Sequence, residues 1–132
     1  MESDVVVFDS SAIIAYYIDS DSHHAEAHRI ALGLHAKTSV LHPFVIQEVA
    51  TVLTYRFSKA VADRFFEDIQ GGQNLMIPAL EIEKDIAFFR QAKRKMSFAD
   101  LALIRLEKEM NAPLFTFDEQ ILSFLHKGRL SV

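Results

Sequence analysis

Short apolar segments alternate along the chain with longer segments in which apolar residues recur at helical spacing. The first apolar segment, 5–8, is a continuous run rich in β-branched residues, which is typical of a strand buried on both faces of a sheet. Further strands are expected at 38–41, 75–77, 114–116 and 129–132. Strands that are separated by helices favour parallel crossovers. The alternation therefore predicts an α/β fold, a three-layer α/β/α domain with a mainly parallel sheet of four or five strands.

The segments between these strands have the caps and the periodicity of helices. Ser58 and Ser97 stand where N-caps are expected, Pro43 suits a first helical turn, and Gly71 with Gly72 ends a helix. We expect helices over 12–18, 23–35, 43–57, 58–71, 80–95, 97–110 and 118–125. The chain has 132 residues and shows neither a repeat nor a linker, so we expect a single domain over residues 1–132.

Composition limits the classes of function that are open to this chain. Half of its residues are apolar and 24% are charged, as in globular proteins. It has no cysteine, which excludes disulfide frameworks, thiolate zinc sites and cysteine nucleophiles. Its net charge of −4 argues against nucleic-acid binding through overall basic charge. No apolar run approaches the roughly 20 residues of a membrane span, so we expect a soluble, cytoplasmic protein without a membrane partner.

Four acidic side chains occupy positions that invite a functional interpretation. Asp9 follows the first strand directly, and Asp118 comes just after the strand at 114–116. The carboxyl ends of parallel strands lie at one edge of a sheet, which is where α/β proteins bind ligands. Glu48 lies at the border of the apolar face of its helix, and Asp100 is the third helical residue after Ser97 and is followed by four apolar residues.

These acids have two explanations, and their spacing does not decide between them. Asp9 and Asp118 suit N-caps, each worth about 1 kcal/mol, while Ser97 and Asp100 have the spacing of a capping box, and Glu48 suits a charge at the rim of the helix. Alternatively, clustered carboxylates bind hard cations such as Mg²⁺ or Mn²⁺, which prefer oxygen ligands. Two such ions can activate a water and stabilise the leaving oxygen of a phosphodiester.

Four segments, in this order, carry a resemblance to a known family. They are VVVFDSSAIIAY at 5–16, IQEVA at 46–50, MSFADLALI at 96–104 and LFTFD at 114–118. Together they resemble the PIN-domain nucleases, and most closely the VapC-type toxins of type II toxin–antitoxin pairs, over nearly the whole chain. The third segment is followed by Arg105, Leu106 and Glu107, where relatives often have small residues.

The resemblance implies a function and a set of site residues. It implies an endoribonuclease that depends on Mg²⁺ or Mn²⁺ and hydrolyses RNA phosphodiester bonds. It also implies a homodimer and a cognate antitoxin protein that blocks the acidic site. The catalytic and metal-binding acids would be Asp9, Glu48, Asp100 and Asp118, with Asp9 and Asp100 as the best direct ligands and with Ser11 and Thr116 as supporting hydroxyls.

Basic residues and histidines give two further signals. A basic patch precedes the third segment and would either hold RNA phosphates or complement the dipole of a helix C-terminus; it comprises Arg90, Lys93, Arg94 and Lys95. His24 and His28, four residues apart beside His23, have a spacing that could bind a transition metal. A solvated helix start is the favoured explanation of this histidine cluster.

Three rival functions compete with this interpretation of the motifs. A Mg²⁺-binding receiver-like signalling module needs an acidic pair near the first strand and a lysine after a late one, but Asp9 has no acidic neighbour and no lysine follows 114–117. A haloacid-dehalogenase-type phosphatase needs a second aspartate where Ser11 stands. A catalytically silent PIN fold that only binds RNA or a protein partner is the third alternative.

Overall fold

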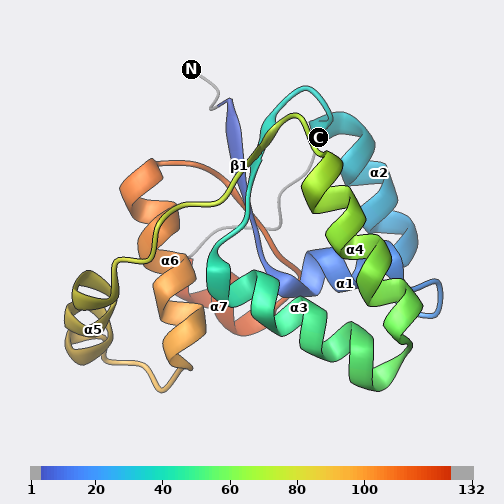
Figure 1. Cartoon of the computed structure of the whole chain (residues 1–132). Coiled ribbons are helices and arrows are strands. Elements are labelled where there is room, and N and C mark those ends of the chain that lie inside the picture. The colour runs from blue at the N-terminus through green and yellow to red at the C-terminus, as the bar shows by residue number, and fades with distance from the viewer. Residues whose placement is uncertain (1–3, 126–132) are drawn as a thin grey trace.

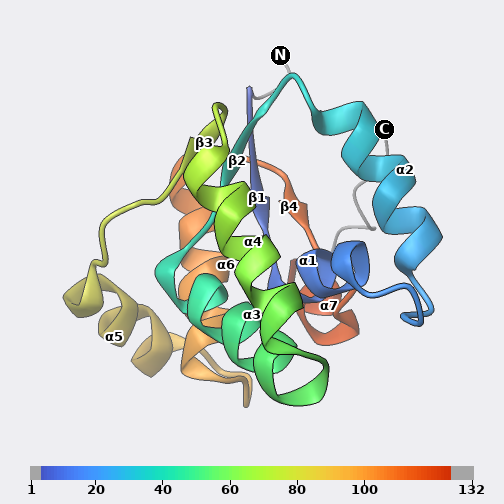
Figure 2. The same ribbon diagram turned by 45° about the vertical axis from the view of Figure 1, so that its right-hand side comes forward.

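A parallel sheet flanked by helices forms the centre of the protein. We describe residues 4–125 of a computed structural model of the chain. Four strands pair in the order β3-β2-β1-β4, and all three pairings are parallel (Figure 2). The strands are β1 (Val5–Phe8), β2 (Thr38–Val40), β3 (Leu75–Met76) and β4 (Leu114–Phe115). The fifth strand, expected at 129–132, lies outside the described residues.

Within the described residues, seven helices surround the sheet and give the expected three-layer α/β/α architecture. In Figure 1, α6 lies on one face of the sheet, while α2 and α4 lie on the other side of β1. The helices are α1 (Ser10–Tyr17), α2 (His24–Leu34), α3 (Pro43–Arg56), α4 (Lys59–Gly71), α5 (Ile82–Gln91), α6 (Phe98–Met110) and α7 (Glu119–Leu125). No helix in the described part of the chain is long and apolar enough to cross a membrane.

Serine caps begin two helices as expected, whereas one helix ends earlier than expected. Ser58 Oγ accepts the Val61 N–H at 3.2 Å, and Ser97 Oγ accepts the Asp100 N–H at 3.0 Å. The helix expected over 80–95 is shorter, because Ala92 turns to an extended conformation after donating its N–H to the carbonyls of the last helical turn. The basic residues after Ala92 therefore lie outside α5.

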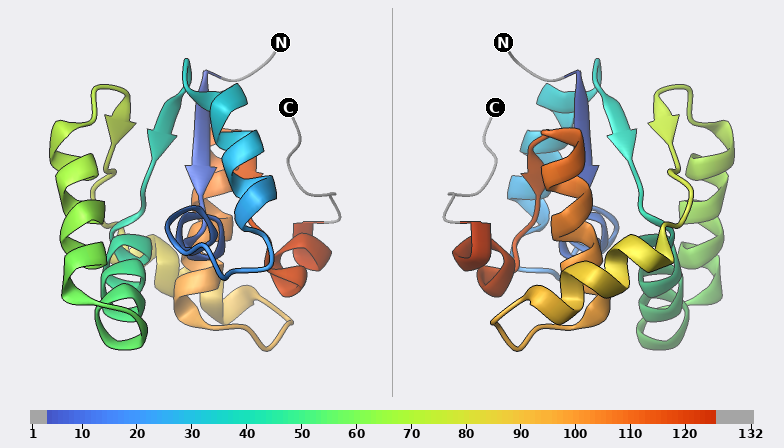
Figure 3. Two further views of the ribbon diagram at one scale, coloured as in Figure 1. Left: turned by 90° about the vertical axis from the view of Figure 1, so that its right-hand side faces the viewer. Right: turned by 90° about the vertical axis from the view of Figure 1, so that its left-hand side faces the viewer.

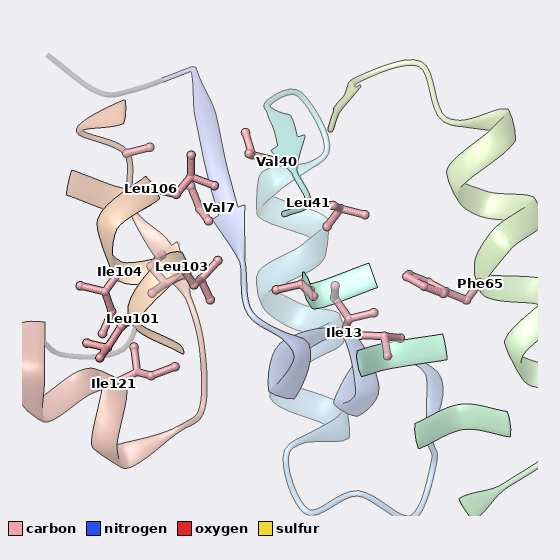
Figure 4. Close-up of a cluster of buried hydrophobic side chains, with 14 of the residues drawn as sticks. Val7, Ile13, Val40, Leu41, Phe65, Leu101, Leu103, Ile104, Leu106 and Ile121 are labelled. Atoms are coloured by element: carbon pink, nitrogen blue, oxygen red, sulfur yellow. The ribbon is translucent and has the colours of Figure 1, made fainter. Parts of the chain in front are cut away.

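The core occupies both faces of the sheet. Val6 and Val7 are fully buried and point to opposite faces, as consecutive strand residues do. Val7 packs with Leu103 and Ile104 of α6 in the larger cluster (Figure 4). Val6 belongs to a smaller cluster with α1 and α2, to which Ile30 contributes. Each such side chain contributes roughly 1.5–3 kcal/mol. The core thus fixes the strand ends on which the acidic residues lie.

Candidate active site

Asp9 lies at the carboxyl end of β1, directly before α1. Its backbone N–H donates to the Phe115 carbonyl at 2.9 Å, which continues the β1–β4 pairing to this residue. Only 4% of Asp9 is exposed. Its side chain makes no N-cap hydrogen bond to α1. The capping explanation therefore does not account for this carboxylate.

Two hydroxyls hold the Asp9 carboxylate. Ser11 Oγ and Thr116 Oγ1 each donate to Asp9 Oδ2 at 2.7 Å. Burial raises the pKa of Asp9, these hydrogen bonds lower it, and the negative charge of Asp118 raises it further. The net direction is upward, so the charged form of Asp9 is costly here without a compensating cation.

The same hydroxyls bind the backbone that follows β4. Ser11 Oγ accepts the Phe117 N–H at 2.9 Å, and Thr116 Oγ1 accepts the Asp118 N–H at 3.0 Å. A hydroxyl can donate one hydrogen bond and accept others, so each side chain connects Asp9 to the segment that carries Asp118. Ser11 and Thr116 thus set the relative position of the two acids.

Asp118 serves as a helix cap as well as a member of the acidic group. Its Oδ1 accepts the backbone N–H groups of Gln120 at 2.8 Å and Ile121 at 3.2 Å. This is the N-cap arrangement for α7, as its spacing predicts. The cap fixes the carboxylate at the end of β4, beside Asp9.

Glu48 reaches the same region from α3. Its Oε1 accepts a hydrogen bond of 2.6 Å from Ser10 Oγ at the start of α1. Ser10 is buried, whereas Glu48 is exposed. Sequence reasoning missed Ser10. Its place beside Asp9 was a signal, but the sequence could not show that its hydroxyl points toward a residue 38 positions away.

The negative charges of all three other acids act on the pKa of Asp100. Its pKa is raised to about 6, first by burial and then by the negative charges of Asp9, Asp118 and Glu48, while the Ser97 hydroxyl lowers it. Four carboxylates, two from the segments that follow β1 and β4 and two from α3 and α6, therefore lie in one region of the molecule.

No cation of the described chain compensates these four acids. The ion pairs formed within residues 4–125 involve other carboxylates, such as Asp85 with Arg105. No three His, Asp or Glu side chains in this range already have the arrangement of a metal site. The donor set nevertheless fits Mg²⁺ or Mn²⁺, because these ions take carboxylate oxygens and keep several water ligands.

The residues of the predicted basic patch lie at the end of α5 and in the segment that follows it. Arg90 lies in the last turn of α5, and Lys93, Arg94 and Lys95 follow the helix as exposed residues. Arg94 Nη2 donates to Ser123 Oγ at 3.2 Å, and its guanidinium lies 5.6 Å from the ring centroid of Phe124. Its contacts are thus with α7, and an RNA-binding role for the patch stays a prediction.

Two of the clustered histidines connect α2 to α1. His24 Nδ1 lies 2.7 Å from the Ala15 carbonyl oxygen, and His28 Nε2 lies 2.9 Å from that of Tyr16. These nitrogens therefore donate to backbone rather than being free for a metal. The favoured explanation, a solvated helix start, describes only part of what these histidines do, because they also stabilise the contact between α1 and α2.

The chain is similar to one known protein family and to a solved structure. The family model described as PIN domain matches residues 6–126. The fold is similar to the crystal structure of Mycobacterium tuberculosis VapC20, described as a sarcin-ricin loop cleaving toxin, with a TM-score of 0.78 and 17% identity. That match covers 96% of this chain and 98% of the other. No curated protein matches the sequence.

Proposed function

Because the chain belongs to the PIN domain family, we propose that it is a divalent-metal-dependent endoribonuclease, the toxin of a type II toxin–antitoxin pair. Its substrate would be RNA, and it would hydrolyse phosphodiester bonds. Support for the toxin assignment comes from the fold shared with VapC20, which is itself described as a toxin that cleaves the sarcin-ricin loop.

The observation that carries this proposal is the electrostatic state of Asp100. Burial, and after it the negative charges of three other carboxylates, raise its pKa to about 6, and the described chain offers these acids no cationic partner. A fold that gathers like charges at the carboxyl edge of a parallel sheet has a cation-binding role as its simplest physical explanation.

Each acid has a distinct place in the proposed site. Asp9 and Asp100 would be direct ligands of Mg²⁺ or Mn²⁺, and Glu48 and Asp118 would complete the group directly or through water. The bound ion would supply Lewis acidity toward the phosphodiester and lower the pKa of a bound water. The ion would also offset the negative charge that otherwise repels RNA from an acidic chain.

The residues around the acids would keep them in place. Ser11 and Thr116 hold Asp9 through Oδ2, and Ser10 holds Glu48 through Oε1. Asp118 is fixed by the cap of α7. Carboxylates that are already oriented lose little conformational freedom when they bind a cation, which is the advantage of preorganisation.

We further propose the partners and location that the VapC-type resemblance implies. They are a cognate antitoxin that covers the acidic site, a second copy of the chain in a homodimer, and the cytoplasm as the compartment. A catalytically silent member of the family is the alternative, and it would bind RNA or a partner without cleaving.

Cleavage assays with a matched acid variant test the proposal. The purified chain is incubated with total cellular RNA and with a sarcin-ricin loop hairpin in Mg²⁺, in Mn²⁺ and in EDTA. Asp100→Asn should abolish cleavage, whereas Asp63→Asn, the same chemical change at an exposed site on α4, should retain it. Cleavage in EDTA, or by Asp100→Asn, would overturn the mechanism. Metal binding without cleavage of any RNA would favour the silent alternative.

A further inference from the structure

His23 differs from the other histidines of the described chain. The others each place a ring nitrogen within hydrogen-bond distance of a backbone group; they are His24, His28, His35 and His42. His23 is half-buried, and within residues 4–125 neither of its ring nitrogens takes part in a hydrogen bond or ion pair. Its donor capacity is therefore available to a molecule outside the chain.

The imidazole of His23 is held in a fixed position. It stacks on the ring of Phe117 with centroids 4.4 Å apart and an interplanar angle of 5°. Phe117 is buried, so its ring gives the imidazole a fixed apolar surface to stack on. The His23 backbone N–H donates to Asp21 Oδ1 at 2.8 Å, which fixes the chain at the start of α2.

This stack lies next to the acidic residues. Phe117 directly precedes Asp118, and its N–H donates to Ser11 Oγ, which in turn donates to Asp9. Figure 3 shows the loop from α1 into α2 passing beside α7, the helix that Asp118 caps. His23 therefore belongs to the rim of the candidate active site, although sequence spacing grouped it with His24 and His28.

We propose that His23 donates a ring N–H to a phosphate of the RNA strand next to the phosphate that is cleaved, an inference that rests on the proposed nuclease function. An imidazole has an N–H donor in both of its protonation states. Phosphate contacts fix the register of a nucleic acid without reading its bases. A donor of this kind suits the rim of an acidic site, because the four carboxylates offer an RNA strand no favourable contact of their own.

The competing explanation is that His23 only covers the apolar ring of Phe117. A phenylalanine at position 23 would do this equally well, since it keeps the aromatic stack and lacks the N–H donor. The two explanations therefore make opposite predictions for His23→Phe.

Binding of a fluorescein-labelled RNA hairpin, followed by anisotropy in Mg²⁺, tests the proposal. All proteins carry Asp100→Asn so that the RNA stays intact. Adding His23→Phe or His23→Ala should weaken binding about tenfold, the usual effect of losing a hydrogen bond to a charged group. Adding His35→Ala should leave binding unchanged, because His35 is an exposed histidine at the opposite end of α2. Thermal unfolding should show that His23→Phe keeps the fold.

Two results would overturn the role of His23. One is His23→Phe binding the hairpin as tightly as its parent, and the other is a hairpin that binds neither this parent nor the unmodified chain. Cleavage assays keep this failure separate from failure of the proposed function. If cleavage requires Asp100 while His23→Phe binds RNA normally, the nuclease stands and only the phosphate contact is wrong. If Asp100→Asn cleaves RNA, the nuclease mechanism itself is wrong.

Discussion

At the scale of single residues, the site depends on hydroxyls that connect two segments far apart in the sequence. Thr116 is fully buried, donates to Asp9 and accepts the Asp118 N–H. Asp9 and Thr116 are separated by 107 positions, so no local pattern could reveal their contact. Their places after strands singled out Asp9 and Asp118, and the resemblance named Ser11 and Thr116 as supporting hydroxyls. The tertiary structure was needed to show which atoms these hydroxyls bind.

Replacing Thr116 by valine removes both hydrogen bonds with little change in shape. We expect Thr116→Val to lower the free energy of unfolding by about 1–3 kcal/mol, because a buried carboxylate and a backbone N–H lose a partner. RNA cleavage should fall as well, since Asp9 is less well oriented. Urea unfolding and cleavage rates measure both effects. Thr51→Val, at an exposed threonine on α3, is the control. Unchanged stability and activity in Thr116→Val would show that these hydrogen bonds do not position Asp9.

The raised pKa of Asp100 predicts how stability depends on pH. The folded protein holds this proton up to a pKa of about 6, whereas the ordinary value of the carboxyl is 3.8. The folded state therefore binds more protons between these values, and the stability that protonated Asp100 contributes is lost as pH rises through about 6. Asp100→Asn should remove this loss.

Unfolding in EDTA at several pH values between 4 and 7 tests that sign. The stability of Asp100→Asn relative to the unmodified chain should increase with pH, by roughly 1 kcal/mol once screening of this half-exposed group is allowed for. Subtracting one curve of unfolding free energy against pH from the other removes the contribution of carboxylates that titrate alike in both proteins. A difference that is constant or decreases with pH would contradict the raised pKa of Asp100 that burial and the three neighbouring acids produce.

At the scale of elements, α5 and α6 are joined by a buried ion pair. Arg105 Nε donates to Asp85 Oδ1 at 2.6 Å, and Asp85 is almost fully buried, with its other oxygen unpartnered in residues 4–125. Arg105 stood where the resemblance favours a small residue, and the structure supplies the reason for its presence. This pair fixes α5 against α6, the helix that also carries Asp100.

Breaking this pair should be costly. Asp85→Ala leaves the largely buried guanidinium of Arg105 without its closest partner, which typically lowers the free energy of unfolding by 3–5 kcal/mol. The exposed pair of Lys59 and Asp63 on α4 provides the contrast, because Asp63→Ala should cost less than about 1 kcal/mol. Chemical denaturation compares the two directly. Similar losses of unfolding free energy in both variants would mean that burial does not make the Asp85–Arg105 pair more stabilising than an exposed pair.

Element types were more predictable than their ends. A continuous run rich in β-branched residues predicted β1, short apolar segments predicted the other described strands, and serine caps predicted where α4 and α6 begin. The helical periodicity of 80–95 continued past the point where the chain turns extended at Ala92, so it did not mark the true end of α5. Helical periodicity indicates which residues could share one face of a helix. Where the last helical turn ends is decided instead by tertiary contacts and by the hydrogen-bond partners of its carbonyl groups.

At the scale of the whole molecule, one sheet edge collects contributions from four separate segments. Parallel pairing of β1 with β4 brings Asp9 beside Asp118, and the packing of α3 and α6 adds Glu48 and Asp100. The folded chain must therefore hold together a set of charges that repel each other. Whether residues 1–132 unfold as the single domain predicted from length stays a prediction, which one cooperative transition would support.

A cation that offsets this repulsion should stabilise the fold. Any ligand that binds the native state alone raises the free energy of unfolding, by about 2.7 kcal/mol at a hundred times its dissociation constant. We therefore expect the melting temperature to rise with added Mn²⁺ or Mg²⁺ and to return to its starting value in EDTA. Asp100→Asn should show a much smaller rise, because it removes a proposed direct ligand, whereas Asp63→Asn should respond like the unmodified chain. Equal stabilisation of Asp100→Asn would place the cation elsewhere, and no stabilisation of the unmodified chain would leave the four acids without the role proposed for them.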